Sequence, residues 1–260
     1  MSSKHYAKKR FGQHFLTDQR VIAQIVKSIN PKPGEQILEI GPGLGALTEA
    51  VLQQCHAMIA IELDRDVIPK LAERCGALGQ LQIYAQDALV ADYATFKTDE
   101  RLLRIIGNLP YNISTPLLFH LINFREVIQD MHFMLQKEVV ERMTAEVDTD
   151  HYGRLSVMLQ YFCQTQWLFE VPPTAFSPPP QVDSAVVRLI PHTELPYSAK
   201  NFQLFSDVVR LAFMHRRKTL RNNLKDFVSD EQFAQANIDH RARAETISIE
   251  QFVALANILN

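Results

Sequence analysis

The chain has 260 residues, 47% of them hydrophobic and 22% charged, an ordinary globular composition long enough for one large domain or two smaller ones. Its formal net charge of -2 gives no overall basic character, so binding to nucleic acid would need a local patch. Three widely spaced cysteines without a C-x-x-C pair argue against a disulfide framework or a zinc site and favour a reduced, cytoplasmic location. We expect no metal, and no apolar run reaches the length of a membrane span.

The first half of the chain alternates between helical and strand patterns. Apolar residues at helical spacing predict a helix over 18–29, which the Asn30-Pro31 pair ends. Short apolar runs then predict strands, each followed by a polar or glycine-rich segment. This alternation predicts a mostly parallel sheet flanked by helices, with ligands at the carboxyl ends of its strands. The predicted strands cover 36–40, 57–61, 81–85, 102–106 and 131–135; the predicted helices cover 46–54, a segment ending near 75, one capped by Ser114 or Thr115, and one from 137.

The pattern changes after about Tyr152, where strands become rare and helical spacing takes over. A proline-rich run over 172–180 separates two more predicted strands, and a polar, proline-containing linker follows them. We therefore predict an α/β, Rossmann-like catalytic domain over 1–193 and a small all-helical domain over 194–260. The supporting elements are a helix at 155–162, strands at 168–171 and 184–190, and only helical periodicity over 202–260.

A glycine-rich loop, Gly41-x-Gly43-x-Gly45, follows the first predicted strand and opens a helix. Glycine lets the backbone approach a ligand closely and adopt positive φ. Glu62 ends the next strand, where an acid can bind ribose hydroxyls. Because Gly41-x-Gly43-x-x-Ala46 also fits a relaxed dinucleotide fingerprint, the loop alone leaves NAD open as the cofactor.

Three features favour S-adenosylmethionine over NAD. Glu39 lies two residues before the loop, where an acid can meet the methionine amine. Asp87 follows the third strand, where it can accept from the adenine amino group. The fourth strand ends in a motif suited to a methyl acceptor, whereas nothing in the chain demands a pyrophosphate.

That motif is Asn108-Leu109-Pro110-Tyr111. The lone pair of an exocyclic adenine amine is delocalised into the ring, so the amine attacks poorly unless two acceptors hold its hydrogens. The Asn108 side-chain oxygen and a rigid backbone carbonyl beside Pro110 can supply those acceptors, and Tyr111 can stack on the base. The alternative is an ordinary turn, since Asn-x-Pro-Tyr is common loop chemistry.

The sequence resembles the ribosomal RNA adenine dimethyltransferases, and within them the bacterial small-subunit branch. That branch converts two adjacent adenosines in a 3′-terminal hairpin loop of 16S rRNA to N6,N6-dimethyladenosine; the sibling branch that modifies large-subunit RNA matches the C-terminal helices less well. The matching stretches, which span nearly the whole chain, are 11–16 (FGQHFL), 38–45 (LEIGPGLG), 108–111 (NLPY), 152–156 (YGRLS), 176–184 (FSPPPQVDS) and 216–224 (RRKTLRNNL).

The resemblance implies roles for single residues. His14 stands where the family often has Asn, and Leu109 stands where many DNA adenine methyltransferases have Pro, which favours the dimethylating RNA branch. The implied cofactor-binding residues are His14, Leu16, Gly41, Glu62, Asp87 and Asn108, and the implied catalytic residues are Asn108, Leu109, Pro110, Tyr111 and Phe176.

Phe176 and a basic segment each have two interpretations. Phe176 either packs on the target adenine opposite Tyr111 or anchors the proline-rich loop in the core. Basic residues recur at helical spacing over 217–225, which predicts an amphipathic helix whose outer stripe either is merely solvated or binds RNA phosphates. The predicted RNA-binding residues are Arg216, Arg217, Lys218, Arg221 and Lys225, with the basic N-terminal residues Lys4, Lys8, Lys9 and Arg10 as a further contact.

Three rival functions remain open from the residues alone: a DNA adenine methyltransferase, an RNA-binding assembly factor with a relic cofactor pocket, and an NAD-dependent oxidoreductase. The intact acids and Asn108-x-Pro110-Tyr111 argue against a relic, and no hydride-transfer acid or base is found. We expect a monomeric enzyme that acts late in small-subunit biogenesis on a 30S assembly intermediate, because a short basic stripe cannot read sequence by itself.

Overall fold

The computed structural model describes residues 14–260, so the basic N-terminal residues lie outside the described part of the chain. The chain separates into two compact units, the first reaching to Val140 and resuming over Gln166–Pro191, the second comprising Glu141–Thr165 and His192–Asn260. The predicted domains place all of 141–165 with the sheet. In the structure this segment belongs to the helical unit, because the helix within it packs on two C-terminal helices.

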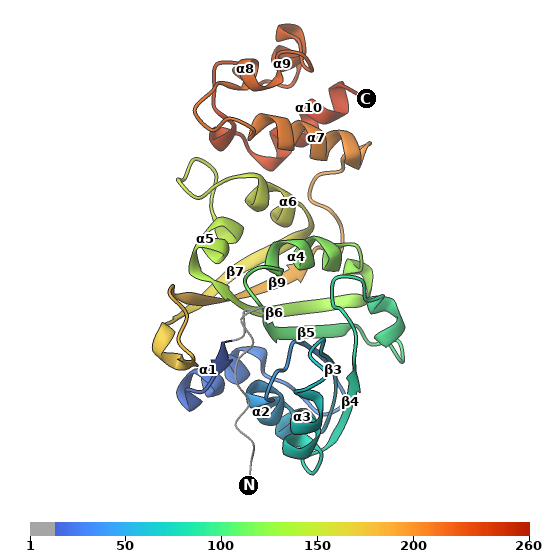
Figure 1. Cartoon of the computed structure of the whole chain (residues 1–260). Coiled ribbons are helices and arrows are strands. Elements are labelled where there is room, and N and C mark those ends of the chain that lie inside the picture. Colours follow the sequence, from blue (N-terminus) through green and yellow to red (C-terminus); the bar gives the residue numbers. More distant parts are fainter. Residues whose placement is uncertain (1–13) are drawn as a thin grey trace. The chain divides into compact units, whose positions relative to one another are not determined.

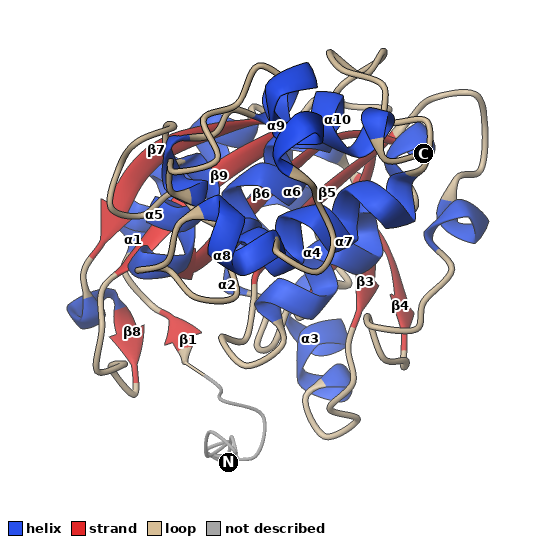
Figure 2. Cartoon of the chain, turned by 90° about the horizontal axis from the view of Figure 1, so that it is seen from above, coloured by secondary structure: helices blue, strands red, loops and turns tan. Residues whose placement is uncertain are grey.

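A mixed sheet forms the centre of the first unit (Figures 1 and 2). Within residues 14–260, seven strands make this sheet, and β1 (Phe15–Leu16) and β8 (Phe176–Ser177) make a separate two-stranded ribbon. Strands β2 to β6 are parallel to one another, and β9 is antiparallel to β6. In order across the sheet they are β4 (Gln80–Tyr84), β3 (Ala57–Ile61), β2 (Gln36–Ile40), β5 (Leu103–Asn108), β6 (Ile128–Gln136), β9 (Ser184–Pro191) and β7 (Cys163–Val171).

The predicted Rossmann-like fold is confirmed, and β2 and β3 have the predicted bounds. The fourth predicted strand runs further than expected, so that Asn108 is the last residue of β5 and not part of the loop. Since β3, β2 and β5 are adjacent and parallel, Ile61, Ile40 and Asn108 end at the same edge of the sheet. This edge is where a ligand site is expected.

Among the helices of the first unit, α1 begins at a side-chain cap, whereas α2, α3 and α4 have none. Asp18 caps α1 by accepting from two backbone N–H groups, and four apolar residues of α1 enter the core. The predicted cap of α4 is wrong: Ile113 occupies the N-cap position, because the Ser114 hydroxyl donates to the Tyr111 carbonyl instead. The helices are α1 (Gln19–Ile29), α2 (Ala46–Cys55), α3 (Ile68–Cys75), α4 (Ser114–Ile122) and α5 (Lys137–Thr144), the last of which ends in the second unit.

The second unit is helical, with a core that includes Phe205, Phe233 and Phe252. The predicted continuous basic helix over 217–225 is wrong, because the chain turns after α7 and only a short α8 forms. The Asn223 amide stabilises this turn by donating to the carbonyls of Ala212 and His215. The helices of the second unit are α6 (Arg154–Phe162), α7 (Phe202–Ala212), α8 (Leu220–Leu224), α9 (Asp230–Gln235) and α10 (Ile249–Ile258). No helix within residues 14–260 is long and apolar enough to cross a membrane.

A buried ionic network connects α1 with three strands of the sheet. The Arg104 guanidinium donates to both Asp130 carboxylate oxygens, at 2.9 and 3.0 Å, and to the Ile29 carbonyl at the end of α1. Arg188 adds a third bond to Asp130 from β9. Burial by itself would raise the pKa of Asp130, but the bonds from Arg104 outweigh it and lower this pKa. Asp130 is therefore ionised and paired in the core.

We predict that Asp130→Asn lowers the free energy of unfolding by up to about 3–5 kcal/mol, because it removes the buried carboxylate that pairs with Arg104 and leaves Glu35 as the remaining acidic partner of this guanidinium. Urea unfolding of the purified protein measures this change. Glu126→Gln is the matched control, since Glu126 pairs with Arg125 at the surface and its side chain is exposed. Equal midpoints for the two variants would contradict the assignment of the network as a central contributor to stability.

Candidate functional site

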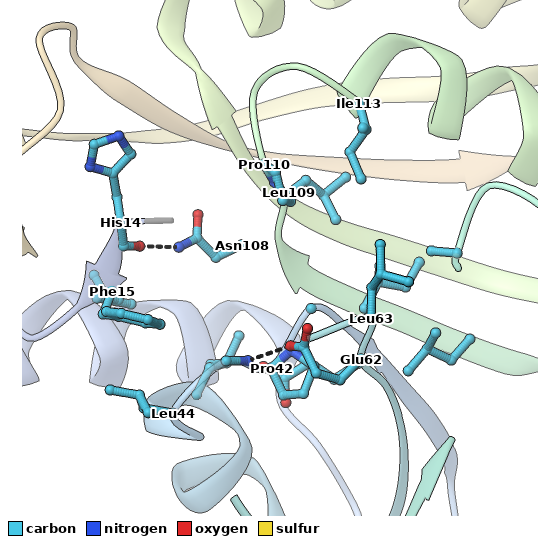
Figure 3. A pocket seen from close by; sticks show the side chains of 18 of the residues that line it. His14, Phe15, Pro42, Leu44, Glu62, Leu63, Asn108, Leu109, Pro110 and Ile113 are labelled. Carbon is cyan, nitrogen blue, oxygen red and sulfur yellow. Dashed lines mark hydrogen bonds between the residues drawn. The ribbon is translucent and has the colours of Figure 1, made fainter. Parts of the chain in front are cut away.

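A cavity of about 430 Å³ opens at the carboxyl ends of β2, β3 and β5 (Figure 3). It brings together the glycine loop, the acids that follow β3 and β4, and the segment that ends β5, although these are far apart in sequence. The predicted site residues that line it are His14, Leu16, Gly41, Glu62, Asp87, Asn108, Leu109, Pro110 and Tyr111.

The glycine loop has the conformation that glycine alone adopts without strain. Gly41, Gly43 and Gly45 have φ values of 66°, 54° and 81°. A Cβ atom at Gly41 would meet no atom within 4 Å, so this glycine borders open space in the cavity. A Cβ atom at Gly45 would lie 2.7 Å from the Leu71 side chain, so this glycine permits close packing of the loop on α3.

Two buried carboxyl groups border the loop. Glu39 accepts a 2.6 Å hydrogen bond from the Thr48 hydroxyl, and burial raises the pKa of Glu39 to about 7, with Glu62 adding to the rise. Glu62 accepts from the backbone N–H of Gly43 at 3.1 Å (Figure 3) and from the backbone N–H of Asp64 at 2.8 Å. Burial also raises the pKa of Glu62, against these hydrogen bonds.

The charges of the cavity favour a cationic ligand. Three carboxyl groups line it (Glu39, Glu62 and Asp87), and the guanidinium of Arg74 is paired with Glu49. A pyrophosphate would meet this acidic lining unfavourably, whereas a ligand with an ammonium or sulfonium group would meet it favourably. The lining therefore argues against the dinucleotide that the glycine pattern left open. Within residues 14–260, no group of three or more His, Cys, Asp or Glu side chains is arranged to hold a metal.

The Asn108 amide has a defined orientation. Its Nδ2 donates to the backbone carbonyl of His14 at 3.1 Å (Figure 3), which turns the side-chain oxygen away from that contact. A carbonyl cannot accept from another carbonyl oxygen, so the bond fixes which end of the amide faces His14. Oδ1 is thereby left as the acceptor that Asn108 offers to a ligand.

Two residues far away in sequence restrain the Tyr111 side chain, one at its hydroxyl and one at its ring. Its hydroxyl forms a 2.8 Å hydrogen bond with the hydroxyl of Ser184, a fully buried residue at the start of β9. Its ring lies against the ring of His14, with centroids 5.9 Å apart and planes 26° apart. Burial raises the pKa of Tyr111, so its phenol is neutral at physiological pH.

Phe176 does not line this cavity. It is buried, belongs to the hydrophobic core that contains α1 and α2, and pairs with Leu16 in the ribbon of β1 and β8. This placement agrees with the core interpretation of Phe176. Stacking on a target adenine stays a prediction.

The predicted RNA-binding residues lie in the second unit and differ in their pairing. Arg216 pairs with Glu245 and Asp150, and Arg221 pairs with Asp230 at 2.7 Å. In the described part of the chain, Arg217, Lys218 and Lys225 have no such acidic partner. The positive charges of Arg216 and Arg221 are thus partly neutralised, whereas, within residues 14–260, those of the other three residues are not.

Sequence reasoning missed three residues that shape the site. Thr48 binds Glu39, Ser184 binds Tyr111, and Arg74 donates to the Leu44 carbonyl in the glycine loop. Thr48 follows the glycine loop by three residues, so a search of the next helical turn could have found it. Nothing local in the sequence indicates Ser184 or Arg74, since both contacts come from the tertiary fold.

The sheet has five parallel strands followed by the antiparallel β9, and its acidic cavity lies beside β2, β3 and β5. This is the fold of S-adenosylmethionine-dependent methyltransferases, and this chain is a Rossmann-like methyltransferase. The family follows from the whole sequence. The profile of the ribosomal RNA adenine dimethylase family matches residues 4–260, so the chain belongs to that family, as its motifs predict.

Individual relatives agree with this assignment. The chain is 56% identical to the ribosomal RNA small subunit methyltransferase A of Acinetobacter baylyi, covering 97% of this chain and 92% of the relative. It is similar to the crystal structure of a dimethyladenosine transferase from Plasmodium falciparum, with a TM-score of 0.79, 26% identity, and coverage of 93% and 96%. The structure of the 23S rRNA methyltransferase ErmE, with a TM-score of 0.74, 22% identity, and coverage of 94% and 99%, shows a similarity of fold alone.

We predict that the affinity of the protein for S-adenosylhomocysteine rises with pH up to about 7 and is level above it. With a pKa of about 7, Glu39 is largely protonated below that pH in the free protein. A ligand ammonium beside Glu39 favours the carboxylate, so binding below pH 7 releases a proton and weakens by up to about tenfold per pH unit. Calorimetric titrations in buffers of different ionisation enthalpy measure both the affinity and the number of protons released on binding.

Glu39→Gln is the control for this dependence, because it keeps the shape of the side chain and removes its titration. We expect weaker binding with a flatter pH profile. An unchanged slope in this variant, or no dependence in the parent protein, would show that Glu39 does not meet the ligand cation.

Proposed function

We propose that this chain transfers methyl groups from S-adenosylmethionine to N6 of two adjacent adenosines in the 3′-terminal hairpin loop of small-subunit (16S) rRNA, and that it does so late in subunit biogenesis. Family membership and the 56% identical relative, whose name specifies the small ribosomal subunit, support the reaction and the kind of RNA. The observation that carries the proposal is the orientation of Asn108, whose oxygen is presented at the cavity that the glycine loop borders.

The residues of the cavity fit S-adenosylmethionine in size and charge. A volume of about 430 Å³ with an acidic lining suits a nucleoside that carries an ammonium and a sulfonium. We assign Glu39 to the ammonium, Glu62 to the ribose hydroxyls and Asp87 to the adenine amino group, with Gly41 giving space and His14 and Leu16 at the rim. When bound, the cofactor supplies an already activated methyl group.

The protein then has to orient and activate a weak nucleophile. Asn108 Oδ1 accepts one hydrogen of the adenine amine, and a backbone carbonyl beside Pro110 accepts the other, which favours a tetrahedral nitrogen with an available lone pair. Tyr111 stacks on the base, an interaction worth roughly 1–3 kcal/mol. An N6 that displaces the thioether from the methyl carbon becomes cationic, so it readily loses one of its protons to water. No strong general base is needed, and positioning supplies most of the acceleration.

The target adenosines have to leave their stack to reach Asn108, which a hairpin loop permits at low cost. We assign a partly assembled small subunit as the substrate, because a few basic side chains recognise shape and phosphates more readily than sequence. The enzyme acts as a monomer in the cytoplasm, where ribosomes assemble.

The direct test uses small subunits that lack the modification and labelled S-adenosylmethionine, followed by digestion and identification of nucleosides. We expect N6,N6-dimethyladenosine at two adjacent positions near the 3′ end. Protein-free small-subunit RNA is the parallel substrate, and equal activity on it would overturn the assembly-intermediate assignment. Methyl transfer to duplex DNA but not to subunits would overturn the function itself.

We predict that Asn108→Ala abolishes methyl transfer while S-adenosylhomocysteine binding survives in weakened form, since the variant loses the acceptor for the amine. Asn108→Asp is the informative companion. It keeps an acceptor oxygen, but a carboxylate cannot donate to the His14 carbonyl, so its orientation is lost and we expect activity well below that of the parent protein. Single-turnover assays at saturating cofactor measure both, and near-normal turnover of the alanine variant would defeat the mechanism.

We also predict unequal roles for the basic residues of the second unit. Replacing Arg217, Lys218 and Lys225 by Gln should weaken RNA binding. It should also make the slope of the logarithm of the binding constant against the logarithm of salt concentration shallower, by about 0.7–0.9 for each phosphate contact that is lost. Replacing Arg216 and Arg221 by Gln should change the salt dependence less, because Glu245 and Asp230 already offset their charges. Filter binding of small-subunit RNA between low and moderate salt compares the two variants, and identical slopes would contradict this distinction.

A further inference from the structure

His14 contacts three separate parts of the site. Its backbone carbonyl accepts from Asn108, its imidazole Nδ1 lies 2.8 Å from the carbonyl oxygen of Pro178, and its ring lies against Tyr111. These partners come from the end of β5, from the proline-rich run, and from the segment before α4. Among the site residues described above, His14 alone contacts all three.

The contact with Pro178 defines the state of the imidazole. A carbonyl oxygen accepts only, so Nδ1 carries the proton and donates it. The same bond fixes the ring plane, since rotation about χ2 would move Nδ1 away from Pro178. The ring is therefore a rigid surface next to Tyr111.

Tyr111 has two restraints from outside its own motif. The Ser184 hydroxyl holds its phenol at 2.8 Å, and the His14 ring covers part of one face. A ring that is fixed at one end can still rotate about that end, and a neighbouring aromatic ring opposes this rotation. The two restraints together define the plane on which a base can stack.

We propose that His14 is a positioning residue for the target adenosine: its ring supports one face of Tyr111 and leaves the other for the base, while its carbonyl orients Asn108. This inference rests on the proposed function. It differs from the cofactor-binding role that the family resemblance implies, because it assigns the His14 side chain to the acceptor half of the site.

Three substitutions separate the contacts of the side chain. His14→Ala removes the ring and the Nδ1 bond and keeps the backbone carbonyl. His14→Phe keeps an aromatic ring beside Tyr111 without a donor for Pro178, and His14→Asn keeps a donor without an aromatic ring. Thr17→Val is the matched control, since the Thr17 hydroxyl donates to the Ala175 carbonyl and so connects the same two segments through a different hydrogen bond.

The measurement is kcat and KM for unmethylated small subunits at saturating S-adenosylmethionine, with S-adenosylhomocysteine affinity measured separately. We expect about a tenfold loss of kcat for His14→Ala, because loss of base orientation slows the chemical step even when the cofactor is bound. His14→Phe should recover a large part of this loss and exceed His14→Asn, and Thr17→Val should lose less than twofold.

Several results would overturn the proposal. They are an unchanged kcat for His14→Ala at saturating cofactor, a phenylalanine variant no faster than the asparagine variant, or an equal loss in Thr17→Val, which would indicate general loosening of the ribbon. If His14→Ala does not fold, the comparison of His14→Phe with His14→Asn decides alone. Failure of the proposed function is recognised separately, since then the parent protein itself transfers no methyl group to small subunits.

Discussion

The site depends on the close approach of two parallel strands, β2 and β5. A Cβ atom at Gly107 would lie 2.6 Å from the Ile40 carbonyl oxygen, so only glycine fits where these strands end. One residue beyond that contact, β2 enters the glycine loop and β5 reaches Asn108. The spacing between strands therefore places the glycine loop and the Asn108-Leu109-Pro110-Tyr111 segment on one cavity.

Much of this arrangement is predictable from the sequence, because its causes are local. Apolar runs of strand length gave β2 and β3 their bounds, and Asp18 fixed the start of α1 through its own capping bonds. The acids Glu62 and Asp87 follow strands that the βαβ pattern makes parallel, so their convergence follows from topology. The cofactor class follows from charge, since the acids of the lining are visible in the sequence before any distance is known.

Other features could not be predicted, because they arise from contacts between distant segments. The bond between Tyr111 and Ser184 spans 73 positions, and no periodicity encodes it. The basic segment was wrongly predicted as one helix, since helical spacing continues through a turn that Asn223 stabilises by side-chain bonds. Residues 141–165 belong to the helical unit because α6 packs on helices of that unit. The sequence of α6 alone does not show whether this helix packs there or on the sheet.

The ribbon of β1 and β8 has a consequence for the order in which the protein is made. It pairs Leu16 with Phe176, and the bond from His14 to Pro178 spans 164 positions. A chain that is still being synthesised can pair β2 with β5 once Asn108 has emerged, yet it has no partner for β1 until β8 follows. The contacts that hold His14 and Tyr111 therefore form only after the residues up to Ser184 have been synthesised, which makes this part of the proposed site the last to be completed as the chain grows.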